Sequence, residues 1–422
     1  MIRGLRLRYY AVGLLMLAVA ACSSTPPGLS AETRAAVQHL ASFARLNGTG
    51  DIASNQFDIF AHVYDRVRRD YVREVSGEEL MAAAVEAVKG AYDQDFTDDA
   101  KIVKAAISGM LETLDKYSVF LDGDEYNSLL DETKGEFGGI GIEVSKGDGF
   151  IEVVTPLDGT PGAKAGLKPG DQITHADGFS LAALSFRDAV QRLRGRVGTK
   201  IMLTIDRDGV QSFETTIIRE IIKIEAVRWG LEEKIGYVRI TSFNAHTGSE
   251  LQKAVGSIRK ELGKNFIGLV IDLRNNPGGL LNQSIEVSDA LLDKGQIVST
   301  RGRNDVNSYT ASFGDIVRGL PVIVLINRGS ASAAEIVASA LKYHDRALLI
   351  GEKSFGKGSV QTIIPMAGQQ GLKLTTALYY TPSGRTVDDG ISPHILVEMD
   401  DTLDGDEQLQ RALVEIRRMA SS

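Results

Sequence analysis

The chain has 422 residues, of which 43% are hydrophobic and 24% are charged, as in ordinary globular proteins. This length exceeds what one hydrophobic core normally serves, so we expect two or three domains. Acidic residues outnumber basic residues by 55 to 47, and the net charge is −8. Nucleic acid is therefore a poor match as a partner, because phosphate binding needs a basic face.

The first 21 residues have the features of a secretion signal. Three arginines among the first eight residues precede an apolar stretch, residues 11–21, that ends in small side chains. The run Val-Ala-Ala-Cys-Ser that follows resembles the lipobox of bacterial lipoproteins, which implies cleavage before Cys22 and a lipid on this residue. The alternative is a plain secretory signal with a chance cysteine near its cleavage site. We favour the lipid, because Cys22 is the only cysteine of the chain.

A lipid on Cys22 predicts a protein that is anchored to a membrane without spanning it. No further apolar run of about 18 residues follows, so we expect no transmembrane helix in the body. The expected location is the bacterial cell envelope, on the periplasmic or another extracytoplasmic side. A single cysteine excludes a disulfide within the chain and a cysteine-based metal site.

Residues 22–54 are rich in serine, proline and glycine at both ends and predict a tether that contains a short helix. From residue 55 to about 130 the pattern is helical: Phe57, Phe60 and Tyr64 recur at helical spacing. Such a helical region supports the rest of the protein or mediates oligomerisation, and the sequence leaves both roles open.

The composition changes at about residue 131, where glycine alternates with apolar residues. A G-x-G pattern there invites a nucleotide-binding interpretation, which we reject because no helix follows and the third glycine is missing. The order of pieces over residues 131–220 resembles a PDZ domain: a glycine loop, a short helix, a second helix at 185–194 and two closing strands. A glycine-rich hairpin without a ligand is the alternative.

In a PDZ domain, backbone N–H groups of the glycine loop bind a peptide's terminal carboxylate, and the peptide adds a strand to the sheet. The residues expected to bind the peptide are those of the loop and two on the second helix: Phe137, Gly138, Gly139, Ile140, Gly141, Ile142, Phe186 and Val190.

The remaining chain, residues 221–400, alternates short apolar β-branched runs with helical segments, as in an α/β domain with a buried parallel sheet. The turn from Arg274 to Gly279 follows one of these strands. Its consecutive glycines allow backbone N–H groups to face a cleft, and we expect Arg274 to fix the loop. Residues 401–422 are acidic and then helical, without a motif.

The strongest sign of chemistry lies in residues 321–361. Ser332 begins a helix on a tight turn, where free backbone N–H groups suit an anion. Lys357 stands between two glycines with apolar strands on either side, and an apolar pocket lowers the pKa of a lysine until it can act as a base. Gln361 shares a strand face with position 357, so its amide can hold the amine.

Ordinary roles compete with this interpretation. A serine in the first helical turn is usually a cap, and a lysine in a glycine turn is usually solvated. Other chemistries find less support: the sequence holds neither H-E-x-x-H nor G-x-S-x-G, and its six histidines lack metal-ligand spacing. We therefore expect no metal site. A Ser–His enzyme that uses His344 is a weaker alternative.

Four segments together resemble the carboxyl-terminal processing protease family, tail-specific peptidases of the Ser–Lys type. The likeness covers residues 55 to 400 and includes the PDZ-like segment. Its motifs are N-R-G-S-A-S-A-A-E-I at 327–336, S-F-G-K-G-S-V-Q at 354–361, D-L-R-N-N-P-G-G at 272–279 and L-Y-Y-T-P-S-G-R at 378–385. Two positions depart from the family: Ala334 replaces a common serine, and His394 replaces a common aspartate.

The resemblance implies Ser332 as nucleophile, Lys357 as general base and Gln361 as the residue that orients the lysine. It places the oxyanion hole at the N–H groups of Ala333 and of Gly278 or Gly279. It needs no cofactor. In this family the PDZ domain also gates the protease, and we hypothesise Arg194, at the end of the second PDZ helix, as the link.

The predicted fold is α/β and multidomain: a helical N-terminal region, then a PDZ-like β-rich domain inserted before a crotonase-like α/β protease core. The expected activity is that of an anchored serine endopeptidase that captures the apolar C-terminal tails of protein substrates. A homo-oligomer and an adaptor protein are further expectations. The alternatives are a non-catalytic PDZ scaffold and a crotonase-like enzyme. The predicted boundaries are 1–21, 22–54, 55–130, 131–220, 221–400 and 401–422.

Overall fold

The structure is a computed structural model that describes residues 30–46, 54–92, 99–399 and 405–421. The predicted signal and Cys22 lie outside the described residues, as does part of the predicted tether. Among the residues that are described, no helix combines the length and the apolar character needed to cross a membrane.

A six-stranded sheet forms the centre of the core domain. All of its neighbouring strands are parallel except the first pair. In order across the sheet the strands are β10 (Val227–Glu232), β11 (Ile235–Ile240), β12 (Gly268–Asp272), β15 (Val322–Ile326), β16 (Leu348–Gly351) and β19 (Ile395–Leu396). Every residue of β12 and β15 is buried, because helices cover both faces of a parallel sheet.

The two faces of this sheet have different helices. Val322 and Val324 of β15 point into a cluster with α8 (Thr247–Leu262), α9 (Leu281–Asp289) and α10 (Ala333–Tyr343). Ile323 and Leu325 point the other way, toward α11 (Glu407–Ala420), whose Leu413 and Ile416 are buried. The alternation of a strand therefore buries both sides of the same apolar run. A short 3-10 helix, η1 (Gly263–Asn265), follows α8.

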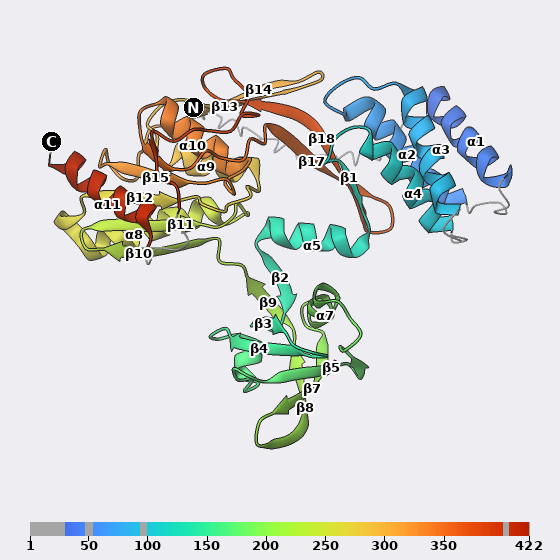
Figure 1. Cartoon of the computed structure of the whole chain (residues 1–422), viewed down its shortest axis with the longest axis horizontal. Coiled ribbons are helices and arrows are strands. Elements are labelled where there is room, and N and C mark those ends of the chain that lie inside the picture. The colour runs from blue at the N-terminus through green and yellow to red at the C-terminus, as the bar shows by residue number, and fades with distance from the viewer. Residues whose placement is uncertain (1–29, 47–53, 93–98, 400–404, 422) are drawn as a thin grey trace, which may run out of the picture.

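A second, antiparallel sheet connects the core to the helical region. Its strands are β1 (Val119–Leu121), β13 (Gly295–Gly302), β14 (Val306–Ala311), β17 (Ser359–Met366) and β18 (Gln370–Tyr380). The long β17–β18 hairpin extends from the core toward the four N-terminal helices (Figure 1). Its Ile364, Leu372 and Leu374 are part of the same hydrophobic cluster as those helices.

The N-terminal helices are α1 (Ala31–Leu46), α2 (Ser54–Asp70), α3 (Gly77–Tyr92) and α4 (Asp99–Glu112). Leu40, Phe60, Leu80 and Met110 form their common core and are fully buried. This corrects the expected tether at 22–54: its helical part, α1, packs into the bundle because Ala36 and Leu40 lie on one apolar face.

The PDZ-like segment forms a separate small domain with its own hydrophobic core, which includes Ile151, Val153, Ile173 and Leu203. Its strands are β3 (Ile142–Lys146), β4 (Ile151–Pro156), β5 (Gln172–Ala176), β6 (Phe179–Ser180), β7 (Lys200–Arg207) and β8 (Val210–Ile218), with helices α6 (Pro161–Lys164) and α7 (Phe186–Leu193). Strand β3 pairs only with β4, which leaves one edge of the sheet open.

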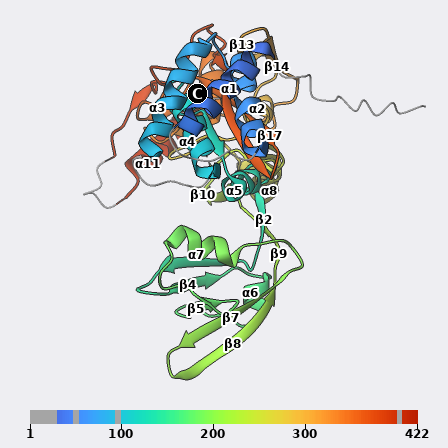
Figure 2. The ribbon, with the colours of Figure 1, turned by 90° about the vertical axis from the view of Figure 1, so that its right-hand side faces the viewer.

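A two-stranded ribbon, β2 (Glu136–Gly139) with β9 (Glu220–Lys223), joins this domain to the core. Where the ribbon meets the core, the N–H of Ile224 donates to the carbonyl of Gly135 at 2.8 Å. Helix α5 (Gly123–Lys134) lies between the core and the PDZ-like domain (Figures 1 and 2). Asp122 caps its start, and Gly135, in the left-handed region, ends it.

Candidate active site

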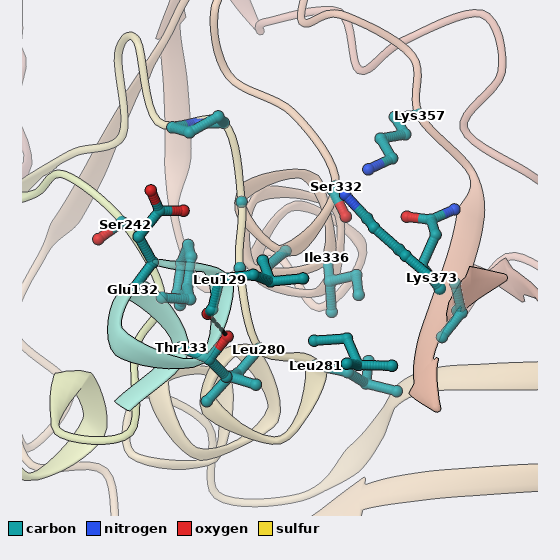
Figure 3. A pocket seen from close by; sticks show the side chains of 18 of the residues that line it. Leu129, Glu132, Thr133, Ser242, Leu280, Leu281, Ser332, Ile336, Lys357 and Lys373 are labelled. Carbon is teal, nitrogen blue, oxygen red and sulfur yellow. Dashed lines mark hydrogen bonds between the residues drawn. The ribbon is translucent and has the colours of Figure 1, made fainter. Parts of the chain in front are cut away.

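A cavity of about 510 Å³ lies between α5, the loop before α9, the start of α10, and strands β17 and β18 (Figure 3). It brings together all six residues that the sequence predicts for catalysis and for the oxyanion hole. They come from three separate parts of the chain: Gly278, Gly279, Ser332, Ala333, Lys357 and Gln361.

Ser332 has φ 54° and ψ −113°, a region that is costly for a residue with a side chain, by about 1–3 kcal/mol. The N–H of Ser332 donates to Oε2 of Glu335 at 2.8 Å, and its carbonyl accepts from the hydroxyl of Tyr379 at 3.2 Å. These contacts hold the turn that places Ser332 on the wall of the cavity.

Glu335 is a residue of the site that was not predicted from the sequence. Its fully buried carboxylate accepts hydrogen bonds from the N–H groups of Ser332, Gly356 and Lys357 and from the hydroxyl of Ser354, at 2.6–2.9 Å. One carboxylate therefore holds the turns that carry Ser332 and Lys357. The spacing S-x-x-E from Ser332 to Glu335 is typical of a capping box, and this pattern could have predicted the first of these contacts.

The amine of Lys357 is desolvated. Burial lowers its pKa from 10.5 to about 8, and the positive charge of Lys373 contributes, while Asp115 and Glu335 act in the opposite direction. The amine lies 4.7 Å from the centroid of the Tyr117 ring. It points toward Ser332 in Figure 3, although the hydrogen bonds of the described residues do not include one between the two side chains.

Gln361 lies on the cavity but has other partners than the predicted one. Its amide donates to the hydroxyls of Ser359, at 2.9 Å, and Thr375, at 3.3 Å. Strand β17 differs in two ways from the strand that the sequence predicts. It begins only at Ser359, and a register shift separates Val360 from Gln361. Lys357 and Gln361 therefore do not belong to one regular strand face.

The two glycines of the Arg274–Gly279 turn differ in what their N–H groups do. That of Gly278 donates to Oδ1 of buried Asn276 at 2.8 Å. Those of Gly279 and Ala333 have no acceptor among the hydrogen bonds of the described chain. Gly278 itself approaches the turn of Ser332 so closely that an added Cβ would lie 2.8 Å from Cβ of this serine.

Arg274 is fixed in an ionic network, as the sequence predicts. Its guanidinium donates to buried Asp272 at 2.7 Å and to Asp406, at the start of α11, at 2.6 Å. Burial raises the pKa of Asp272, but the hydrogen bonds and charge of Arg274 outweigh this and hold that pKa below its usual range. The C-terminal helix is thereby connected to the glycine turn of the site.

The predicted peptide-binding residues of the PDZ-like domain are divided between two elements and a turn. Phe137, Gly138 and Gly139 belong to β2, so the predicted loop shrinks to Ile140 and Gly141 before β3 begins at Ile142. Phe186 and Val190 lie on α7, whose buried residues are Ala189 and Leu193. Phe186 and Val190 therefore stand outside the domain core.

Arg194 ends α7 and faces α5. Its guanidinium lies 4.1 Å from the centroid of the Phe137 ring. Burial raises the pKa of Asp131 on α5, and the charge of Arg194 acts against that rise, which places the two residues near each other. Both line a second cavity between α5 and α7.

Among the described residues, no histidine lines the cavity of Ser332 and Lys357. Nε2 of His344 contacts the carbonyl of Gln296 at 2.8 Å, so the structure gives no support to a Ser–His pair. Across the described residues, no group of histidine, cysteine and acidic side chains is arranged to hold a metal ion.

Comparison with known proteins agrees with this architecture. The model of peptidase family S41 matches residues 234–397, and that of the PDZ domain matches residues 152–207. A carboxy-terminal-processing protease of Bartonella bacilliformis is 47% identical over 344 residues, which cover 80% of this chain and 74% of that protein. The carboxy-terminal processing protease CtpA of Bacillus subtilis is 38% identical, over 75% of this chain and 68% of that protein.

The solved structure of a photosystem II D1 C-terminal processing protease has a TM-score of 0.51 and 28% identity, over 86% of this chain and 98% of that chain. The match extends over most of both chains. The chain therefore belongs to the carboxyl-terminal processing proteases, serine peptidases of family S41 that carry a PDZ domain.

Proposed function

We propose that this serine protease cleaves peptide bonds with a Ser332–Lys357 dyad. The observation that carries the proposal is a desolvated lysine, with a pKa of about 8, on the same cavity as a serine held in a strained turn. With this pKa about a tenth of the lysines are neutral at pH 7, against fewer than one in a thousand for an ordinary lysine, and the neutral amine can accept a proton.

In the proposed mechanism, Oγ of Ser332 attacks the carbonyl carbon of the scissile bond while Nζ of Lys357 takes its proton. The protonated amine then gives that proton to the leaving amine, and water cleaves the acyl-enzyme by the same route. The side chain of Lys357 must move to within hydrogen-bond distance of the hydroxyl, because no such bond is formed in this conformation.

The oxyanion of the tetrahedral intermediate is assigned to the N–H groups of Ala333 and Gly279. Between the two candidate glycines we favour Gly279, because the N–H of Gly278 already donates to Asn276. A donor of this type contributes roughly 3–4 kcal/mol to transition-state stabilisation in comparable sites. Gln361 is proposed to orient Lys357 once the amine moves toward Ser332.

The dyad is tested with the purified full-length chain and a fluorogenic peptide that ends in an apolar residue. Ser332→Ala and Lys357→Met should each abolish turnover while thermal unfolding shows an intact fold. Gln361→Ala should reduce the rate less severely, because it transfers no proton. Turnover by folded Lys357→Met, with contamination excluded, would overturn the dyad. The same result with Ser332→Ala would overturn the nucleophile.

The PDZ domain is proposed to bind a free, apolar C-terminus. The open edge of β3 and the side chains of Phe186 and Val190 outside the core support an added peptide strand between β3 and α7. Because the charge of Arg194 acts on Asp131 of α5, and α5 lines the catalytic cavity, we propose that tail binding is transmitted through this pair of charges.

Substrates with free and amidated C-termini test this second proposal. Amidation removes the charge that the loop N–H groups bind, at a cost of roughly 1–3 kcal/mol, or about five- to 150-fold in affinity. Equal cleavage rates for both substrates would refute tail recognition. If Arg194→Ala keeps the full stimulation by the free tail, the domain docks substrates without gating the protease.

We propose that the mature protein is anchored to the cell-envelope membrane by a lipid on Cys22, on the basis of the lipobox-like run that ends at the only cysteine. Mass spectrometry of the mature N-terminus tests this, and an unmodified thiol there would refute the anchor. Assembly into a homo-oligomer and use of an adaptor protein stay predictions, and light scattering of the purified protein tests the first.

A further inference from the structure

A second lysine, Lys373, points into the catalytic cavity. It lies in β18 opposite Ile363 of β17 and Val119 of β1. Its neighbours Leu372 and Leu374 are fully buried against the N-terminal helices, so the alternation of the strand directs Lys373 to the opposite face. That face is the cavity wall, and Figure 3 shows the amines of Lys373 and Lys357 both directed toward Ser332.

Among the described residues, no carboxylate forms an ion pair with the amine of Lys357 or of Lys373. Among the described residues, no ion pair or hydrogen bond involves the amine of Lys373. Asp115, which faces Lys357, is already engaged by the N–H groups of Tyr117 and Ser118. The carboxylate of Glu335 is likewise occupied by backbone N–H groups.

Two other charged groups lie near Lys357 or on the same cavity. Lys116 is exposed on the turn before β1 and lies over the rings of Tyr117 and Phe355, while Glu132 of α5 lines the far side of the cavity. The like charge that acts on Lys357 therefore comes from Lys373. A nearby like charge disfavours the protonated form of an amine.

We propose that Lys373 is a positioning residue of the active site, whose positive charge shifts Lys357 toward its neutral, proton-accepting form. The inference rests on the proposed role of Lys357 as the base. It takes the burial of Lys357 as one of two causes of its lowered pKa and Lys373 as the other. Lys373 itself exchanges no proton with the substrate in this proposal.

The experiment records kcat/KM from pH 6 to 9.5 for the wild type, Lys373→Met, Lys373→Arg and Lys116→Met. Lys116→Met is the matched control. It removes an exposed lysine that lies over the same Tyr117 ring as Lys357 but is not one of the described residues that line the cavity. In Lys373→Met the rise of kcat/KM with pH should occur at higher pH than in the wild type. At pH 7 kcat/KM should be about three- to tenfold lower, and the values of the two proteins should converge as pH rises. Lys373→Arg should restore the wild-type pH dependence.

A second measurement does not depend on catalysis. In the Ser332→Ala background, the rate at which acetic anhydride labels Lys357 is followed against pH by peptide mass spectrometry. The midpoint should move upward when Lys373→Met is added and stay in place with Lys116→Met. Thermal unfolding confirms that each variant is folded.

Two results would overturn the inference. One is an unchanged pH dependence of kcat/KM and an unchanged labelling midpoint in Lys373→Met. The other is an equal loss of activity at every pH in folded Lys373→Met, which would make Lys373 a group that contacts the substrate. A failure of the proposed dyad is detected separately, as turnover by Lys357→Met. In that case the labelling of Lys357 still tests whether Lys373 lowers its pKa.

Discussion

Oε2 of Glu335 accepts a hydrogen bond from the backbone N–H of Lys357 at 2.9 Å. The same oxygen accepts from the N–H of Ser332, so the positions of the proposed nucleophile and base depend on one buried carboxylate. Neither contact uses the reacting atoms. The carboxylate acts on the backbone, which leaves the hydroxyl and the amine available for chemistry.

Glu335→Gln should therefore damage both stability and activity. The amide replaces an acceptor oxygen with a donor, which faces N–H or hydroxyl donors on either side. Loss of one charged hydrogen bond costs about 1.5–3 kcal/mol, and we expect a lower Tm and at least a tenfold lower kcat. Glu86→Gln, at an exposed position of α3, is the control for the chemical change. Wild-type kcat in Glu335→Gln would contradict the role of Glu335.

The second prediction concerns the pH dependence of activity. Burial and the charge of Lys373 lower the pKa of Lys357 to about 8, and only the neutral amine accepts a proton. The value of kcat/KM should therefore rise with pH and level off above about 8. Steady-state rates with a peptide whose own charge is constant over this range provide the measurement. A flat profile from pH 6 to 9 would exclude Lys357 as the base.

The same pKa predicts an effect on stability. Between pH 8 and 10.5 the unfolded chain, with an ordinary lysine, binds more protons than the native state, so the free energy of unfolding rises with pH in this window. Below pH 8 the full cost of the buried charge is present. Lys357→Met should therefore unfold at a higher temperature than the wild type at pH 7, and this advantage should shrink as pH approaches 10.5. The Tm of Lys357→Met and of the wild type is measured at both pH values. A difference in Tm between the two proteins that is the same at pH 7 and near pH 10.5 would contradict the prediction.

Gly278→Ala tests the close approach of the glycine turn to the nucleophile. Gly278 has φ +104°, and an added Cβ would lie 2.8 Å from Cβ of Ser332 and 2.9 Å from the carbonyl oxygen of Ala331. We expect a loss of activity of at least a hundredfold, because small displacements of reacting groups are costly. Gly256→Ala is the control: it lies in α8 with open space around it and should stabilise by about 0.5–1 kcal/mol. Normal kinetics in Gly278→Ala would refute the steric argument.

The sequence predicted those parts of the site that are encoded locally. Ser332 follows a strand and a turn and begins a helix, and Lys357 lies between glycines, so each signal is contained in a few neighbouring residues. Glu335 also accepts hydrogen bonds from residues 19 to 22 positions away, and Lys373 reaches the cavity through the register of β18. No short pattern reports a register, and this is why the second lysine was missed.

The fold shows the same division. Buried strands such as β12 and β15 were predicted because continuous apolar runs mark them. Strand β10 was missed because it is an edge strand with exposed Trp229 and Leu231, and β2 because glycines resemble a loop. Helix α1 was assigned to a tether because its neighbours are rich in proline and glycine, while its partners are in other helices.

The hydrogen bond between Gly135 and Ile224 makes the PDZ domain an exchangeable module. The chain leaves and re-enters the core at two points that this bond holds together. A short connector can therefore bridge them, and loop-closure entropy changes only slowly with loop length. A chain built in this way can exchange the inserted domain for another without rebuilding the fold around Ser332.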